Sequence, residues 1–243
     1  MTEMPGQLSS REERVLLHEL NHRINNEFAA AIGTVSLAAA RSGNENVKTA
    51  LTAVTELLHN YAHVHRALQM PEHDTLFDAA AYVRELCLAI SRSQLDYRKI
   101  NVVLETEPLW LKADRCWRLG MIVYELISNA ARHAFREREG AIRIELEGVG
   151  AFVKCSVLDN GSSDASVAPG RGLKIIRELT ESLGGQLNQK FGPSGSSSIL
   201  VFPCAAAAEH SATKSVQPEI TQVAEEIPIA DERPHAIRFQ ACG

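Results

Sequence analysis

Two successive helical stripes near the N-terminus constrain the fold of this chain more than any other feature. Across residues 11–41, apolar side chains recur every three or four positions, at Leu16, Leu20, Ile24, Phe28, Ile32 and Val35. A break at residues 42–44 precedes a second stripe with heptad spacing, at Val47, Leu51, Val54, Leu58, Tyr61, His65 and Leu68. Two such helices joined by a short turn form an antiparallel hairpin. Because one hairpin cannot bury both stripes, we expect it to pair with a second copy in a dimeric four-helix bundle.

The pattern changes after Pro71, where the second helix stops. Helical and strand patterns then follow one another without strict alternation, which predicts an α+β two-layer sandwich. The predicted helices cover residues 78–95, 114–135 and 171–183, and the predicted strands cover residues 101–105, 109–111, 141–148, 151–159, 185–190 and 197–202.

The chain therefore divides into four predicted regions. We expect residues 1–10 to be a flexible N-terminus, residues 11–72 to form the helical hairpin and residues 73–204 to form the sandwich domain. Residues 205–243 carry scattered prolines and acids without a sustained period, so we expect a flexible tail there.

Composition narrows the classes of function. Apolar residues make up 45% of the 243 residues and charged residues 23%, as in soluble globular proteins. A net charge of −5 gives no basis for nucleic-acid binding, and the apolar runs are too short to span a bilayer. The first ten residues lack the pattern of a signal peptide, and the five scattered cysteines lack metal-ligand spacing. We therefore expect a cytoplasmic protein without nucleic-acid or membrane partners.

The long helix of the sandwich carries polar side chains along one face, in the stretch YELISNAARHAFRER. Glu125, Asn129, Arg132, His133 and Arg136 fall on that face at helical spacing. An amide oxygen can help to hold a hydrated Mg²⁺ ion that phosphates also coordinate, and arginines can pair with the phosphates. The opposite face carries apolar residues suited to packing against a sheet.

Two further motifs lie downstream of this helix. Asp159 ends a predicted strand in the turn sequence Asp-Asn-Gly, where its carboxylate can accept a hydrogen bond from an exocyclic amine such as that of adenine. Gly170 and Gly172 flank the start of a helix, in the sequence GRGLK. Glycines there allow the backbone to approach a phosphate, and a helix N-terminus favours anions.

The order and spacing of these motifs resemble the ATP-binding domain of the GHKL superfamily, specifically that of histidine kinases. In this resemblance Asn129 binds Mg²⁺, Glu125 orients or activates the reacting group, and Asp159 reads adenine. The glycine boxes around the nucleotide and its lid correspond to Gly161, Gly170, Gly172 and Gly195, the last followed by Ser196 where the family often has Thr. Their neighbours Arg132, His133, Arg136, Leu173 and Lys174 complete the expected nucleotide-binding set.

The resemblance also reaches the hairpin, because HELNHRINNEF is similar to the phosphoacceptor box of histidine kinases related to the HWE group. On this reading His22 is the phosphoacceptor, and the resemblance spans residues 11–203. His22 lies about 200° around the helix from Leu20 and Ile24, so it should face solvent, with His18 one turn away. His65 lies on the heptad seam and should be a packed, hydrogen-bonded histidine.

The resemblance implies phosphoryl transfer from MgATP to a neutral imidazole, and then to an aspartate of a response regulator receiver domain. Many histidine kinases carry an acid directly after the histidine, whereas this chain has Arg23 there. The proton acceptor is then Glu19 or Glu125, and Arg23 can pair with phosphate. The input signal is open and can come from a separate sensor or regulatory protein.

Two alternatives stay open. Ser163 stands where the first glycine box usually has its second glycine. A weak or idle ATP domain would leave a histidine phosphotransferase, in which His22 relays phosphate between response regulators. A GHKL anti-sigma-factor-type kinase is the other alternative, although such proteins lack a dimerising hairpin of this kind.

Overall fold

The computed structural model describes residues 10–69, 75–135, 138–162, 171–204 and 236–239. The chain divides into two compact units, Met1–Gln69 and Met70–Gly243. The prediction of a helical hairpin followed by an α+β sandwich is confirmed. No helix in the described part of the chain combines the length and the hydropathy needed to cross a membrane.

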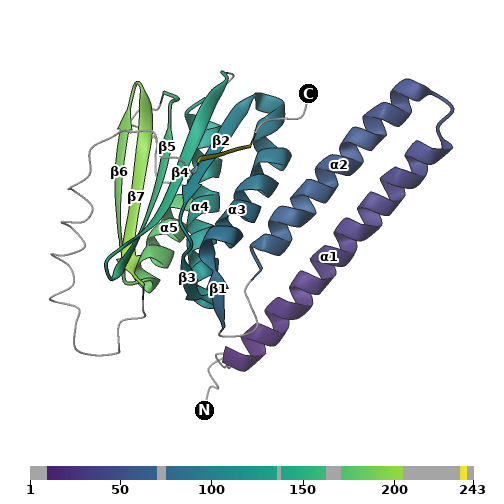
Figure 1. The fold of residues 1–243 in the computed structure, drawn as a ribbon. Coiled ribbons are helices and arrows are strands. Elements are labelled where there is room, and N and C mark those ends of the chain that lie inside the picture. The colour runs from purple at the N-terminus through teal and green to yellow at the C-terminus, as the bar shows by residue number, and fades with distance from the viewer. Residues whose placement is uncertain (1–9, 70–74, 136–137, 163–170, 205–235, 240–243) are drawn as a thin grey trace, which may run out of the picture. The chain divides into compact units, whose positions relative to one another are not determined.

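The first unit is a hairpin of two helices, α1 (Ser10–Arg41) and α2 (Glu45–Ala67) (Figure 1). Asn44 caps the start of α2, where its side chain accepts hydrogen bonds from the backbone N–H groups of Asn46 and Val47. Glu45 places a negative charge in the first turn of α2, where it complements the helix dipole. Residues in and next to the short turn between Arg41 and Glu45 therefore stabilise the start of α2.

The predicted stripe of α2 divides between two faces of that helix. Leu51, Leu58 and His65 are partly buried, and His65 lies 6.0 Å from Phe28 of α1, measured between ring centroids. The alternate members of the stripe are exposed in the single chain, namely Val47, Val54 and Tyr61. One face of α2 therefore packs within the hairpin, and the other leaves apolar side chains uncovered.

The second unit is a six-stranded sheet with helices α3 (Ala79–Ile90), α4 (Ala113–His133) and α5 (Arg171–Ser182) on one side of it (Figure 1). The strand order is β6-β7-β5-β4-β2-β8. The bounds are β2 Ile100–Thr106, β4 Gly140–Val149, β5 Phe152–Asp159, β6 Gln186–Gly192, β7 Gly195–Pro203 and β8 Ala236–Phe239. The pair β2 and β4 is parallel, and the other pairs are antiparallel.

The core lies between the sheet and the helices. Alternate residues of β4, at Ile142, Ile144 and Leu146, are fully or almost fully buried, as the period of two requires. The facing stripe of α4 includes Ile122, Leu126 and Ala130, all buried. This packing leaves the opposite, polar face of α4 available for a site.

Three differences separate this fold from the sequence-based expectations. A strand β1 (Leu76–Asp78) pairs with β3 (Trp110–Lys112) in a separate two-stranded sheet, and only the second of these strands was expected. The helix expected over residues 78–95 ends its α-helical part at Ile90 and continues as a π-helical turn, Ser91–Leu95.

The third difference concerns the expected flexible tail. Strand β8 pairs antiparallel with the free edge of β2, so that expectation is wrong for residues 236–239. The physical reason is that an unpaired strand edge offers backbone hydrogen bonds to any extended segment, whatever its side-chain pattern.

Candidate nucleotide and phosphoacceptor sites

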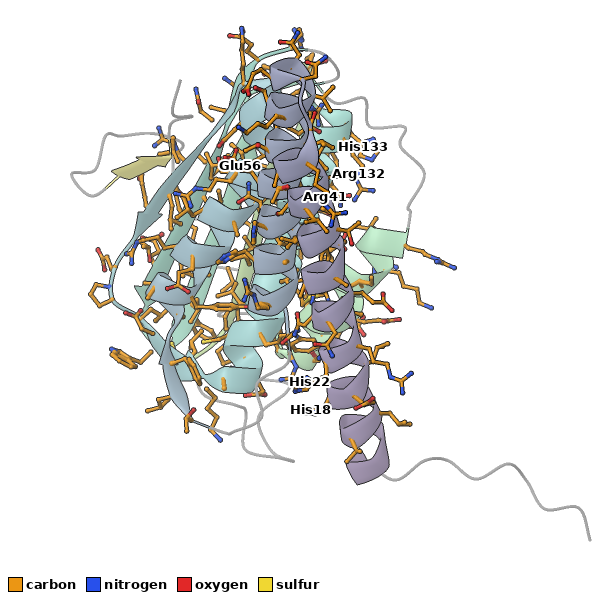
Figure 2. All side chains as sticks on the ribbon, turned by 90° about the vertical axis from the view of Figure 1, so that its right-hand side faces the viewer. His18, His22, Arg41, Glu56, Arg132 and His133 are labelled. Atoms are coloured by element: carbon orange, nitrogen blue, oxygen red, sulfur yellow. The ribbon has the colours of Figure 1, made fainter. Side chains whose placement is uncertain are left out.

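The polar face of α4 presents the residues expected to meet the nucleotide. Glu125 and Asn129 are half-buried and lie one turn apart. Arg132 and His133 are exposed in the last turn of α4, and Figure 2 labels both side chains there. The face thus runs from a partly enclosed acid and amide to an open cationic end. Arg136, also expected on this face, lies outside the described residues.

The start of α5 approaches this face closely at Gly172. A Cβ atom on Gly172 would lie 2.5 Å from Oε2 of Glu125 and 3.7 Å from Nδ2 of Asn129. Only a glycine leaves room for the Glu125 carboxylate in its present position. The fold therefore brings Glu125, Asn129 and the N-terminal turn of α5 together, although they are more than forty residues apart in sequence.

The first turn of α5 also contains Leu173 and Lys174. Leu173 is half-buried, whereas Lys174 is exposed and lies 3.7 Å from Glu178, measured between Nζ and Oε1. This surface ion pair is weak, so Lys174 keeps its freedom to reach an anion at the helix start. Gly170 precedes the described part of α5, so its predicted role lies outside the described residues.

Asp159, at the end of β5, is held by two hydrogen bonds to its carboxylate. Oδ1 accepts from the backbone N–H of Gly161 at 2.9 Å, and Oδ2 accepts from the hydroxyl of Ser196 on the neighbouring strand β7. Gly195 has φ of 138°, and a Cβ atom there would collide with the carbonyl oxygen of Asp159. The motif Gly-Ser at 195–196 therefore allows β7 to approach the aspartate and to supply a donor to it.

Gly161 joins this aspartate to the end of α4. A Cβ atom on Gly161 would lie 2.5 Å from the carbonyl oxygen of Ala134, and the N–H of Ser162 donates to that oxygen at 2.8 Å. The turn after Asp159 is thus packed against the same helix that carries Glu125 and Asn129. The sequence separates these motifs, but the fold places them around one region of the second unit.

The donors in this region suit a nucleotide and a hard cation. Asn129 and Glu125 offer oxygen ligands, which Mg²⁺ prefers, and it usually shares its coordination with substrate phosphates. No group of three or more His, Cys, Asp or Glu side chains forms a metal cluster among the described residues.

In the hairpin, His22 is exposed on α1, as the helical projection predicts. The ring of His18 lies 5.0 Å from that of His22 between centroids, at 60° between planes, and Figure 2 labels both on α1. An incoming phosphoryl donor or acceptor can therefore reach the imidazole of His22 from solvent.

Glu19 and Arg23 form an ion pair beside His22. Nε of Arg23 donates to Oε1 of Glu19 at 2.9 Å, one helical turn away. This hydrogen bond and the charge of Arg23 lower the pKa of Glu19. Glu19 is therefore a weaker proton acceptor than an unpaired glutamate, and Arg23 already has an anionic partner in this state.

His65 is the packed histidine that the heptad seam predicts, and that prediction is confirmed. Its Nδ1 lies 3.3 Å from Nε2 of Gln69, and its ring contacts that of Phe28. Burial lowers the pKa of His65, because the hairpin interior disfavours the charged imidazolium.

Sequence reasoning missed Arg115, which is 3% exposed. Its guanidinium donates to the carbonyl oxygens of Leu183 at 3.1 Å and Pro203 at 2.5 Å, and it lies 5.3 Å from the ring centroid of Phe202. Arg115 thus ties α4 to the end of α5 and the end of β7. An arginine within an apolar helix is the only sequence signal, and it does not identify the two carbonyl groups.

Residues 19–94 match the family described as histidine kinase, and residues 96–195 match the histidine kinase-like ATPase domain. The second match implies that this unit binds ATP.

Among curated relatives, the sensor histidine kinase PdtaS of Mycolicibacterium smegmatis is 28% identical over 206 residues, covering 79% of this chain and 41% of that protein. Blue-light-activated histidine kinase 2 of Erythrobacter litoralis is 25% identical over 189 residues, covering 74% of this chain and 54% of that protein. The chain therefore spans about half of the length of these relatives, or less.

Two solved structures share the fold. The histidine kinase domain of a blue-light activated histidine kinase from Erythrobacter litoralis aligns with a TM-score of 0.54 at 18% identity, over 74% of this chain and 96% of that one. A structure described as a bacterial phosphotransferase aligns with a TM-score of 0.56 at 13% identity, over 82% of this chain and 100% of that one. With its exposed hairpin histidine, its two matched regions and its kinase relatives, the chain belongs to the histidine kinase family, of the HWE-like type.

Proposed function

We propose that this chain is an ATP-dependent protein-histidine kinase of two-component signalling. It phosphorylates His22 from MgATP and passes the phosphoryl group to an aspartate of a response regulator receiver domain. The observation that carries the proposal is the close approach of Gly172 to Glu125 and Asn129. That contact gathers an acid, an amide and a helix N-terminus in the unit that also contains Asp159, in a chain whose hairpin exposes a histidine.

The proposed nucleotide site has a base end and a phosphate end. At the base end, Asp159 accepts a hydrogen bond from the exocyclic amine of adenine, while Gly195 and Ser196 hold the aspartate from β7. At the phosphate end, Asn129 would help to hold Mg²⁺ together with the phosphates, and the bound ion would supply charge neutralisation for the transferring group. The phosphates are met by the side chains of Arg132, His133, Arg136 and Lys174 and by the backbone at Gly161, Gly170, Gly172 and Leu173.

The proposed reaction is an in-line displacement. A lone pair on a neutral imidazole nitrogen of His22 forms the N–P bond, and the bond from the γ-phosphorus to the oxygen of ADP breaks. The imidazole proton passes to a carboxylate. We assign this role to Glu125 before Glu19, because the ion pair with Arg23 lowers the pKa of Glu19 and weakens it as a base. Arg23 then neutralises charge next to the phosphorylated ring.

The proposed assembly is a cytoplasmic homodimer formed through the hairpin. The exposed side chains of Val47, Val54 and Tyr61 would be covered by a second copy in a four-helix bundle. The receiver domain would dock on the hairpin, where it can reach His22. The input signal would come from a separate sensor or regulatory protein.

Labelling with γ-³²P-ATP and Mg²⁺ tests this proposal. Wild-type protein should acquire acid-labile, alkali-stable label, and His22→Ala should acquire none while it still binds ATP. His59→Ala is the matched control, since His59 is an exposed histidine of the same hairpin and should not change labelling. Full labelling of His22→Ala would show that the acceptor is another residue.

Asn129→Ala separates the nucleotide site from the acceptor. It should remove Mg²⁺-dependent labelling and leave the circular dichroism spectrum and the oligomeric state unchanged, because Asn129 lies on the polar face of α4 away from the core. Retained labelling in this variant would contradict the proposed role of Asn129.

A second candidate function is histidine phosphotransfer with an idle ATP domain. It is favoured by the fold likeness to the bacterial phosphotransferase, which extends over the full length of that chain. In that case the wild-type protein would neither bind ATP nor label from it. A phosphorylated receiver domain would instead phosphorylate His22, and not the His22→Ala variant.

A further inference from the structure

Asn160 directly follows the proposed adenine-reading carboxylate, and the function proposed above gives it no role. Its backbone N–H donates to the carbonyl oxygen of Ala141 at 3.3 Å, and its side-chain Oδ1 accepts from the N–H of Ala141 at 2.8 Å. In a regular antiparallel pair, the second bond would go to a backbone carbonyl. The side-chain amide oxygen of Asn160 therefore replaces its backbone carbonyl as the acceptor for the N–H of Ala141.

This replacement lets the backbone leave the sheet immediately after Asp159. Gly161 turns back so that its N–H reaches Oδ1 of Asp159 at 2.9 Å, and the N–H of Ser162 reaches the carbonyl oxygen of Ala134 at 2.8 Å. Asn160 is thus the last residue bonded to β4, through its backbone N–H and its side chain, and the backbone that follows it turns towards the end of α4. We propose that Asn160 is the positioning residue that fixes Asp159 for recognition of a 6-aminopurine.

Gly140 supports this assignment, because it leaves space for the hydrogen bond between Asn160 and Ala141, called the Asn160 clamp below. A Cβ atom on Gly140 would lie 2.8 Å from Oδ1 of Asn160 and would also collide with the ring of Phe135. The start of β4 therefore has room for the Asn160 amide only because residue 140 is a glycine. The clamp and the space for it come from two separate parts of the sequence.

The consequence for Asp159 follows from its hydrogen-bonding capacity. Each carboxylate oxygen can accept about two hydrogen bonds, and here each has one donor, from Gly161 or Ser196. One position on each oxygen stays available for a purine amine. If the Asn160 clamp is lost, the N–H of Gly161 shifts and the Asp159 carboxylate shifts with it. The free acceptor position on that carboxylate then no longer points at the purine amine. Asn160 therefore acts through Asp159 and does not touch the base.

Nucleotide discrimination tests this inference, which rests on the proposed function. ITP differs from ATP in carrying an oxygen in place of the 6-amino group, so it cannot donate to Asp159. Calorimetry of the full chain with MgATP and MgITP should give wild type a clear preference for ATP. Asn160→Ala should lose most of it, with ATP affinity falling about five- to tenfold and ITP affinity within about twofold of wild type.

Three further variants make the test specific. Asn160→Asp keeps an acceptor for the N–H of Ala141 and should retain most of the preference. Asn188→Ala, at an exposed asparagine of the same sheet, should behave as wild type. Asp159→Asn removes the charge that recognises the purine amine. Added to that variant, Asn160→Ala should cause no further loss of discrimination between ATP and ITP.

Each outcome decides between the proposals. If wild type does not prefer ATP over ITP, the role of Asp159 in the proposed function fails. If wild type does and Asn160→Ala keeps that preference, only the inference about Asn160 fails. An equal loss of both affinities would show a purely structural role and would also overturn it. If Asn160→Ala does not fold, Asn160→Ser replaces it, since the shorter hydroxyl cannot reach the N–H of Ala141 in the same way.

Discussion

Substitution of Gly172 by alanine tests whether the start of α5 sets the position of the Glu125 carboxylate. The added Cβ would lie 2.5 Å from Oε2 of Glu125, whereas ordinary contact begins at 3.4 Å, so the oxygen must move by roughly 0.9 Å. A displacement of about 1 Å at a reacting group can cost about 100-fold in rate. We therefore expect Gly172→Ala to slow labelling of His22 by roughly 10- to 100-fold.

The same substitution should leave folding intact. Gly172 is not among the described glycines with positive φ, so alanine can adopt its backbone conformation without strain. Alanine stabilises a helix by roughly 0.5–1 kcal/mol relative to glycine, and the obstructing atom ends a flexible side chain that can rotate away. The Tm of the nucleotide-free protein should therefore stay the same or rise while kinase activity falls.

The assay compares initial labelling rates, ATP affinity and Tm of Gly172→Ala with those of wild type. Gly33→Ala in α1 is the matched control, because a Cβ atom there meets nothing within 4 Å, and it should raise helix stability without slowing labelling. A Gly172→Ala protein that labels at the wild-type rate would refute the reasoning, since it would show that the reaction tolerates a displaced Glu125 carboxylate.

Three further predictions concern stability. Gly195→Ala places a side chain at φ of 138° against the carbonyl oxygen of Asp159; it should lower the free energy of unfolding by about 1–3 kcal/mol in urea titrations and weaken ATP binding. Arg115→Met leaves the carbonyl groups of Leu183 and Pro203 without their donor and should cost about 1–3 kcal/mol in the same assay. Burial lowers the pKa of His65, so the unfolded chain binds the proton more readily than the folded one. The stability of the hairpin should therefore fall as the pH drops through about 6.5, and His65→Gln should flatten that pH dependence in thermal melts.

Much of this fold could be predicted because it is encoded in local periodicity. The long helix expected over residues 114–135 is observed as Ala113–His133, with Ile122 and Leu126 buried as the 3.6-residue period requires. The strand expected over residues 151–159 is observed as Phe152–Asp159. In these elements each residue's environment follows from its own neighbours in sequence.

The features that sequence reasoning missed depend on partners distant in sequence. β1 is three residues long and is stabilised by pairing with β3, and β8 forms on the free edge of β2. Neither strand has enough alternation of its own to be recognised. Arg115 is another such case, because its role depends on where the carbonyl groups of two distant segments converge.

The candidate site was predictable in its parts and not in its geometry. Helical spacing places Glu125 and Asn129 on one face, and the order of the motifs resembles a nucleotide-binding domain. Neither shows that Gly172 limits the room for the Glu125 carboxylate.

The choice between two candidate bases likewise needed the structure, since the sequence alone does not show whether Glu19 or Glu125 is the better proton acceptor. Glu19 is exposed and paired with Arg23, which lowers its pKa, whereas Glu125 is half-buried and packed against the start of α5. Tight positioning on rigid elements is what proton transfer requires, because the acceptor must meet the ring at hydrogen-bond distance. Under the proposed function, Glu125 would therefore take the proton, and the Glu19–Arg23 pair would set the charge around the phosphorylated ring.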